Sequence, residues 1–150
     1  MGKKEKIAKK VTEELFRLLE IDGEISLAIS EDVVEINLST DDSGIVIGRH
    51  GDMLESLQTI LALCISKNLD KFYRVSLEVG DYKKNREEWL RTMLTETKDR
   101  VVRENRDVTI PSLKSWERRI VHLSLKDDKE VVSESVGEGK DRVLVIRPKN

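Results

Sequence analysis

Two seven-residue segments, EISLAIS (residues 24–30) and VVEINLS (33–39), alternate apolar and polar side chains and are separated by only two residues. A period of two is typical of a β-strand that buries one face. Because the connection Glu31-Asp32 is too short for a crossover, the strands are predicted to pair antiparallel as a hairpin. The expected buried positions are Ile25, Leu27 and Ile29 in the first strand, and Val34, Ile36 and Leu38 in the second.

The segments that flank this hairpin have their own periods. Residues 3–20 repeat apolar side chains at helical spacing, and a second helical pattern of roughly four turns begins at about Asp52. A third alternating segment runs from Phe72 to Val79 and ends at Gly80. The predicted apolar helix faces are Ile7, Val11, Leu15 and Leu18, and then Met53, Leu54, Leu57, Ile60, Leu61 and either Cys64 or Ile65. The order helix-strand-strand-helix-strand indicates a compact α+β domain over residues 1–80.

The second half of the chain predicts a different arrangement, over residues 81–150. Residues 81–105 predict one long connecting helix, with apolar contacts from Trp89 or Leu90, Met93 or Leu94, and Val101 or Val102. A second helix is expected within residues 112–125, with the apolar stripe Leu113, Trp116, Ile120 and Leu123. Two strands, 131–136 and 142–146, follow and are joined by the turn GEGK. The fold class is therefore α+β, with two small domains joined by a long helix.

Charge separates the two halves of the chain. Residues 1–80 carry 10 basic and 15 acidic side chains, whereas residues 81–150 carry 17 and 14. The formal net charge of −2 argues against indiscriminate coating of nucleic acid, and a basic binding surface is expected mainly in the second half. The single cysteine, Cys64, cannot form an internal disulfide and is expected on a buried helix face. With no apolar run near the roughly 18 residues that span a bilayer, we expect a cytoplasmic protein without direct membrane insertion.

The segment GIVIGRHG (44–51) places three glycines within eight residues, just before the second predicted helix. A P-loop needs four residues between its glycines, followed by Lys and then Ser or Thr, and here three residues separate Gly44 from Gly48. A dinucleotide fingerprint needs G-x-G-x-x-G inside a parallel crossover, which is absent. One cysteine and two distant histidines give no zinc-ligand spacing. No cofactor or metal is therefore expected.

The remaining pattern is G-x-x-G, formed by Gly48, Arg49, His50 and Gly51. Two glycines allow a backbone to approach a ribose-phosphate chain closely, Arg49 supplies charge, and a helix N-terminus presents free N–H groups. This chemistry suits a clamp for a nucleic-acid backbone. The alternative is an ordinary turn, which is what most such glycine pairs form.

The context of this loop is more specific than its spacing. The stretch IVIGRHGDMLESLQ, preceded by a helix and two strands, resembles the core of a KH domain in the bacterial, type II order. The resemblance implies that Gly48, Arg49, His50 and Gly51 grip about four nucleotides of a single strand. It also implies that Ile45, Ile47 and Leu54 lie near the groove that receives the bases. Ordinary core positions are the alternative for these three apolar side chains.

A second candidate site lies in WERRIVH, where Arg118 and His122 are one helical turn apart and project from the same face. Such a pair can also be a solvated helix face. The segment 111–148 resembles the small single-strand nucleic-acid-binding module defined by an Arg-x-x-x-His pair, including the turn SVGEGKDR and the strand VLVIRP. The resemblance makes Arg142 the third expected member, with an ordinary exposed strand end as the alternative.

Together, the two modules resemble the Jag family of bacterial cytoplasmic RNA-binding proteins, over residues 7–148. The resemblance implies single-stranded RNA as the partner, with single-stranded DNA as an alternative ligand, and a role in post-transcriptional control linked to cell elongation, division or sporulation. Two departures are visible. Many members carry an extra N-terminal domain, whereas this sequence begins at the first predicted KH helix. His50 also stands where the family commonly has a basic residue.

Two other functions are consistent with the residues. One is a scaffold that pairs with another KH-domain protein or with a second copy, and the acidic first half favours it. The other is a metal-dependent nuclease that uses His50 with Asp41 and Asp42, although this acidic pair fits better as the polar turn before the loop. Binding without catalysis remains the main prediction.

Overall fold

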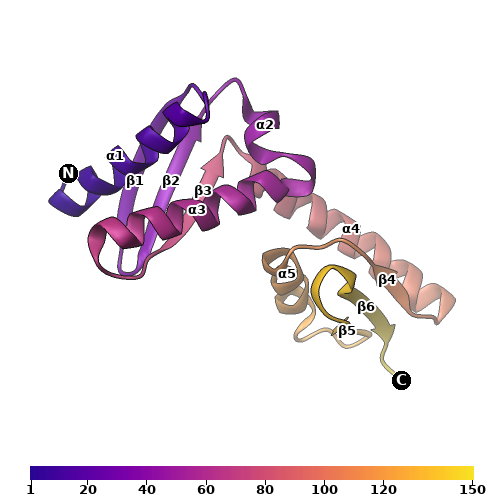
Figure 1. Ribbon diagram of the computed structural model, residues 1–150. Coiled ribbons are helices and arrows are strands. Elements are labelled where there is room, and N and C mark those ends of the chain that lie inside the picture. The colour runs from indigo at the N-terminus through magenta and orange to yellow at the C-terminus, as the bar shows by residue number, and fades with distance from the viewer. The chain divides into compact units, whose positions relative to one another are not determined.

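The computed structural model describes all 150 residues. The chain divides into two compact units, 1–83 and 84–150, and each has its own three-stranded sheet and its own apolar core. The long helix α4 (Tyr82–Glu104) joins them (Figure 1). The predicted class, a mixed α+β chain with two sheet-containing domains joined by a long helix, is confirmed. No helix is both long enough and apolar enough to cross a lipid bilayer.

The N-terminal unit (1–83) follows the predicted order and adds two short elements. It contains α1 (Lys3–Leu18), β1 (Glu24–Ser30), β2 (Val33–Ser39), α2 (Ser43–Ile47), the 3₁₀ turn η1 (Arg49–Gly51), α3 (Asp52–Leu69) and β3 (Arg74–Val79). The sheet order is β1-β2-β3, with β1 antiparallel and β3 parallel to the central strand. The predicted hairpin is correct, and the register places Leu27, Ile36 and Leu77 side by side.

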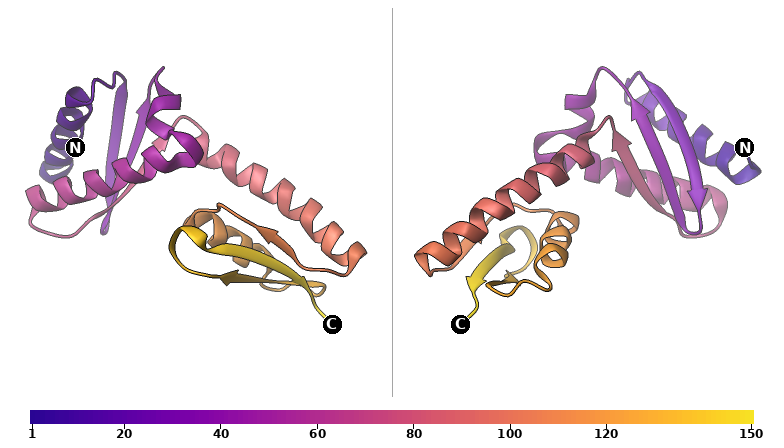
Figure 2. Two further views of the ribbon diagram at one scale, coloured as in Figure 1. Left: turned by 45° about the vertical axis from the view of Figure 1, so that its right-hand side comes forward. Right: turned by 180° about the vertical axis from the view of Figure 1, so that it is seen from behind.

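Helices α1 and α3 cover one face of this sheet, and the other face carries the polar residues of the alternation (Figure 2, right). The α3 residues that reach the core are Leu54, Leu57, Leu61 and Ile65. Three residues predicted on this face are not buried: Met53 and Ile60 are exposed, and Cys64 is half-buried, whereas its alternative Ile65 lies in the core. Helix α3 contacts the sheet through a narrower stripe than its apolar composition suggests.

The structure differs from the prediction at the end of α1 and at the start of β3. In α1 the buried residues are Ala8, Thr12 and Phe16, so Leu18 at the last turn is exposed. Strand β3 begins at Arg74, and Phe72, which was predicted to lie within it, is exposed in the preceding loop. An apolar residue at the end of an element can fit the helix or strand period and still be exposed, because no neighbouring element covers it.

Helix α2 was not predicted, because three of its five residues, Ile45, Val46 and Ile47, are β-branched and favour extended structure. The Asp42 carbonyl accepts hydrogen bonds from the amides of Ile45 and Val46 at 3.0 and 3.1 Å and closes its first turn. Val46 is fully buried in the core. Tertiary packing of this one side chain therefore outweighs the local preference for a strand.

The C-terminal unit (84–150) packs two helices on an antiparallel sheet. After most of α4 it contains β4 (Val108–Ile110), α5 (Ser115–Leu125), β5 (Val131–Val136), the 3₁₀ turn η2 (Gly139–Asp141) and β6 (Val143–Pro148), with sheet order β4-β6-β5. Strand β4 was not predicted, since three residues before Pro111 are too few to show a period. The core residues include Leu90, Leu94 and Val101 of α4, which settles the alternatives left open for that helix.

The buried stripe of α5 differs from the predicted one. The buried positions in and just before this helix are Leu113, Glu117, Val121 and Leu125, whereas Leu123 is 66% exposed and Trp116 and Ile120 are half-buried. The reason is Glu117, a carboxylate that is only 1% exposed. An ion pair with Arg86 of α4, at 2.6 Å, compensates the burial of this carboxylate. The helix therefore turns a face that contains Glu117, and not its most apolar face, toward the core.

Candidate nucleic-acid interface

The clamp loop, residues 48–51, connects α2 to α3 through backbone conformations that favour glycine. Gly48 has φ 70° and ψ −172°, and Gly51 has φ 77°. His50 also lies in the left-handed region, at φ 53°. Residues 49–51 form a single 3₁₀ turn, so the chain reverses direction immediately before the first turn of α3.

Close contacts add a second reason for the two glycines. A β-carbon on Gly48 would lie 2.6 Å from Cβ of Met53, and one on Gly51 would lie 2.9 Å from the Tyr82 hydroxyl. Both distances are shorter than real Cβ contacts allow, so the loop packs against the start of α3 on one side and against Tyr82 on the other. By contrast, Gly44 has open space around its Cα and an ordinary helical position.

The clamp loop presents its polar side chains outward. Arg49 and His50 are exposed, and they lie beside the N-terminus of an 18-residue helix, whose dipole favours anions. Of the apolar residues expected near a groove, Ile45 is 70% exposed, Ile47 is half-buried, and Leu54 lies in the core. The arrangement offers charge, N–H groups and one exposed aliphatic side chain at the same end of α3.

The second candidate site, which we call the basic cluster, comprises Arg118, His122 and Arg142 in the C-terminal unit. The Arg118 guanidinium donates hydrogen bonds to the Leu113 carbonyl at 2.6 Å and to the Ser115 hydroxyl at 3.1 Å. Arg142 follows η2 and immediately precedes β6. These bonds fix the Arg118 head at the N-terminal end of α5.

His122 is held between two serine hydroxyls of β5. Its Nδ1 atom is hydrogen bonded to Ser133 Oγ at 2.6 Å, and its Nε2 atom to Ser135 Oγ at 2.9 Å. Burial lowers the pKa of His122 below its ordinary value, and the charges of Arg118 and Arg142 lower it further. Arg118 and His122 are one turn apart on α5, and the charge of Arg142 acts on the same imidazole.

Sequence reasoning missed Ser133 and Ser135. The available signal was the alternation of VVSESV, in which the two serines share a face with buried Val131. Serines on an inward face need hydrogen-bond partners, and a histidine on the adjacent helix is a suitable one. The pairing could not be inferred without knowing that α5 packs on β5.

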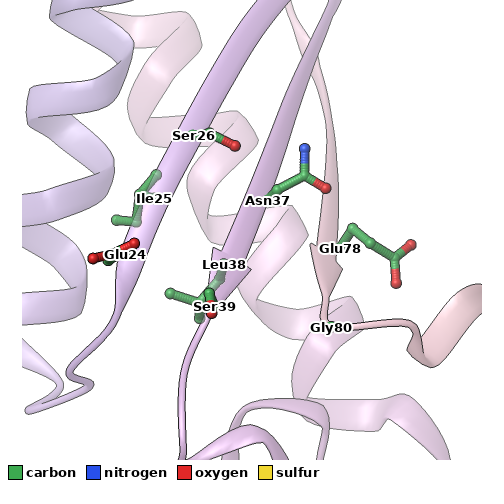
Figure 3. A pocket seen from close by; sticks show the side chains of 8 residues that line it. All are labelled: Glu24, Ile25, Ser26, Asn37, Leu38, Ser39, Glu78 and Gly80. Carbon is green, nitrogen blue, oxygen red and sulfur yellow. The ribbon is translucent and has the colours of Figure 1, made fainter.

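The open face of the N-terminal sheet contains a shallow pocket of about 310 Å³. Figure 3 shows its polar side chains, with Ser26, Asn37 and Glu78 contributed by the three neighbouring strands. Glu24 also lines it. Its two carboxylates and lack of basic residues make this face unsuited to a polyanion.

Asp41 and Asp42, the acidic pair considered for a nuclease, lie in the turn that leads into α2. The Asp42 amide donates to the Thr40 hydroxyl at 3.1 Å, which stabilises this turn. No group of three or more His, Cys, Asp or Glu side chains is placed to hold a metal ion.

Comparison with known proteins follows the same division. The KhpA/KhpB KH-domain model matches residues 5–79, which is half of the chain, and the model of the Arg-x-x-x-His domain matches residues 88–148. The chain belongs to the KhpA/KhpB family. Its KH domain contains the clamp loop, and its Arg-x-x-x-His domain contains all three residues of the basic cluster. The resemblance to the Jag family is thereby confirmed.

Curated relatives of this KhpA/KhpB-family chain carry the name RNA-binding protein KhpB. One from Clostridium symbiosum is 35% identical over 136 residues, which is 89% of this chain and 61% of the relative. One from Bacillus subtilis (strain 168) is 24% identical over 129 residues, covering 85% and 62%. The chain thus spans about three fifths of the length of these relatives.

Proposed function

We propose that this protein binds single-stranded RNA through the clamp loop and the basic cluster, without performing chemistry on it. The observation that carries the proposal is the clamp loop itself. Two glycine-favouring conformations place Arg49 and His50 at the start of α3, where an anionic backbone is stabilised. The names of the KhpB relatives and the two domain matches support RNA as the ligand.

The proposed division of labour follows from the chemistry of each site. The clamp loop grips the ribose-phosphate backbone, and Ile45 and Ile47 lie where aliphatic contact with unstacked bases is available, backed by Leu54 in the core. In the second domain, Arg118 and Arg142 bind phosphates, while His122 is fixed by its serines. The acidic open face of the N-terminal sheet would repel the polyanion, so within the N-terminal unit binding is confined to the loop.

Replacement of Arg49 and His50 by Asp tests the clamp. RNA affinity, measured by filter binding with a labelled single strand, should fall strongly while the circular dichroism spectrum stays unchanged. The control is the double variant Lys3→Glu and Lys6→Glu on the exposed side of α1, which removes at least as much positive charge. Unchanged affinity in the loop variant, or an equal loss in the control, would contradict the clamp.

The salt dependence of binding counts the phosphate contacts. For single strands the slope of log K against log salt is about −0.7 per phosphate contact. Removing one contacting guanidinium, as in Arg118→Gln, should make this slope shallower by roughly that amount. Comparing the affinity for single-stranded DNA with that for RNA shows whether the protein recognises the 2′-hydroxyl groups of RNA.

A second candidate function is pairing with another KH-domain protein or with a second copy of the chain. Its support is an exposed apolar row on α3, formed by Met53, Ile60 and Leu63, of which Leu63 is 71% exposed. Such a row costs hydration free energy unless a partner covers it. Co-purification with the Asp variant of the clamp loop tests it, because a protein contact should survive when RNA binding is lost.

The cellular role that the resemblance to the Jag family implies is proposed as cytoplasmic post-transcriptional control, linked to cell elongation, division or sporulation. Crosslinking the protein to RNA in cells, followed by sequencing of the attached RNA, identifies the targets. Recovery of RNA should depend on Arg49 and His50. Equal recovery with the loop variant would place the RNA contact elsewhere on the protein.

A further inference from the structure

An exposed tryptophan lies in the C-terminal unit, outside the two sites described above. The chain has six aromatic residues, and Trp89 of α4 is 48% exposed, whereas Tyr73 and Phe16 are in the core. The guanidinium of Arg86 lies over the Trp89 ring, 4.1 Å from its centroid. One face of the indole is therefore covered by a planar cation, and half of the side chain still faces solvent.

The guanidinium that covers this ring is itself held by a buried carboxylate. Arg86 Nε donates to Glu117 Oε2 at 2.6 Å, and the Glu117 side chain is almost fully buried. The other carboxylate oxygen of Glu117 accepts a hydrogen bond from the Lys114 amide at 3.1 Å. Because the buried carboxylate has two fixed partners, the guanidinium and the indole stacked on it have little freedom to move.

The stacked pair lies at the same end of α5 as a member of the basic cluster. The Glu117 carboxylate reaches back to the Lys114 amide, and the adjacent Arg118 reaches back to the Leu113 carbonyl. Both anchors are therefore in the segment that starts α5. A nucleic acid held by Arg118 would pass this end of the helix.

We propose that Trp89, backed by Arg86, is a stacking platform for a base of the single-stranded RNA bound at the basic cluster. The inference rests on the proposed function and adds base contact to what is otherwise phosphate binding. An indole held against a guanidinium presents its remaining surface ready for a planar base, and every base has a face that can stack. The platform accepts an unpaired base and excludes a duplex, whose bases are already stacked.

Tryptophan fluorescence tests the contact directly. The chain has two tryptophans, so Trp116→Phe leaves Trp89 as the only indole. Adding single-stranded RNA to this variant should quench its emission, with a midpoint that matches filter binding, while duplex RNA of the same sequence should not. Binding without quenching overturns the proposal.

Affinity in the otherwise unaltered chain provides an independent test. Trp89→Ala should weaken binding about five- to hundredfold, as for other stacked bases, while Trp89→Phe retains most of the affinity. Neither variant removes a charge, so the salt slope should remain that of the parent protein. Equal affinity of Trp89→Ala and the parent overturns the platform alone. Failure of the parent to bind any single strand overturns the proposed function as well.

Discussion

Gly51 combines two constraints at a single residue. Its φ of 77° disfavours any side chain, and the Tyr82 hydroxyl occupies the space that a β-carbon would need. Tyr82 is the first residue of α4 and packs against the core of the N-terminal unit. The clamp loop is therefore shaped by a residue that follows it by about thirty positions in the sequence.

Gly51→Ala should lower the free energy of unfolding by about 1–3 kcal/mol, because the left-handed conformation and the Tyr82 contact both penalise a methyl group. It should also weaken RNA binding. The matched control is Gly44→Ala, at a helical position with open space, which is expected to be neutral or slightly stabilising. Urea unfolding and filter binding measure the two effects. Similar behaviour of both variants would show that the loop conformation is unimportant.

His122 reports on the geometry of the basic cluster through its protonation. Burial is the main cause of its lowered pKa, and the two arginine charges add to it. Arg142→Gln removes one of these charges, so the pKa of His122 should rise toward its ordinary value of about 6.5. An NMR titration in a His50→Gln background, which leaves a single imidazole, measures this change. An unaltered pKa would mean that Arg142 lies too far away to belong to the cluster.

The direction of the His122 shift also sets a pH dependence of stability. Because its pKa is lowered in the folded state, the unfolded chain binds more protons as the pH falls. The contribution of His122 to the free energy of unfolding is fully present above about pH 6.5, and it is lost as the pH falls through the folded-state pKa of His122. His122→Gln should flatten the stability profile in this window, as followed by urea unfolding at several pH values.

At the scale of elements, Asp128 fixes the connection from α5 to β5. One carboxylate oxygen accepts hydrogen bonds from the amides of Glu130 and Val131, at 2.8 and 3.1 Å. The other accepts from Lys98 of α4 at 2.6 Å. The Lys98 hydrogen bond, followed by the backbone bonds, lowers the pKa of Asp128 to about 2. A single side chain thus ties a helix, a turn and a strand together.

Asp128→Ala should lower the free energy of unfolding by about 2–3 kcal/mol, since it removes two hydrogen bonds to backbone amides and an ion pair together. Asp128→Asn keeps an acceptor for the two amides and should cost only about 1 kcal/mol. The control Glu130→Gln alters an exposed partner of the same lysine, 3.5 Å away, and should change little. A large loss of stability in Glu130→Gln would show that Lys98 pairs mainly with Glu130 and not with Asp128.

The same carboxylate predicts a loss of stability in acid. Its pKa is lowered from 3.8 to about 2 in the folded state, so its contribution is present above about pH 4 and disappears as the pH falls toward 2. After allowance for solvent screening, this contribution is about 1–2 kcal/mol. Unfolding of the parent and of Asp128→Asn should therefore converge in acid. Parallel curves over this range would contradict the pairing.

The elements that escaped prediction are the ones whose structure depends on distant partners. Strand β4 has three residues and exists because it pairs with β6, from Val108 opposite Ile146 to Ile110 opposite Leu144. Helix α2 exists because Val46 enters the core. Neither segment is long enough for a helix or strand period to be recognised in its sequence.

At the scale of the whole molecule, the KH domain and the Arg-x-x-x-His domain are joined through α4. The start of this helix is anchored to the N-terminal unit by Lys83, whose ammonium donates to Gln58 at 3.0 Å and to Ser76 at 3.1 Å. The rest of the helix contributes Leu90, Leu94 and Val101 to the core of the C-terminal unit. Linking the two proposed sites in this way would raise the affinity for any strand that reaches both.

Tandem binding predicts a dependence on RNA length. On a strand long enough for both domains, either the Asp variant of the clamp loop or a variant with Arg118→Gln and Arg142→Gln should lose on the order of a hundredfold in affinity. On a strand short enough for one domain, each variant should lose about twofold at most, because the other domain still binds. Equal losses on both lengths would indicate that the two domains do not act on one strand.

The sequence alone determined the order of the long elements and the hairpin, which follow from local period, a property of neighbouring residues. Glycine spacing and charge predicted the two candidate sites, and the resemblance of their motifs to known domains supplied RNA as the proposed ligand. Only the tertiary structure decided which apolar side chains are buried, that Tyr82 shapes the clamp loop, and that Ser133 and Ser135 hold His122. Burial and such contacts depend on how elements that are distant in the sequence pack together. The sequence of one segment does not specify which other element will cover it.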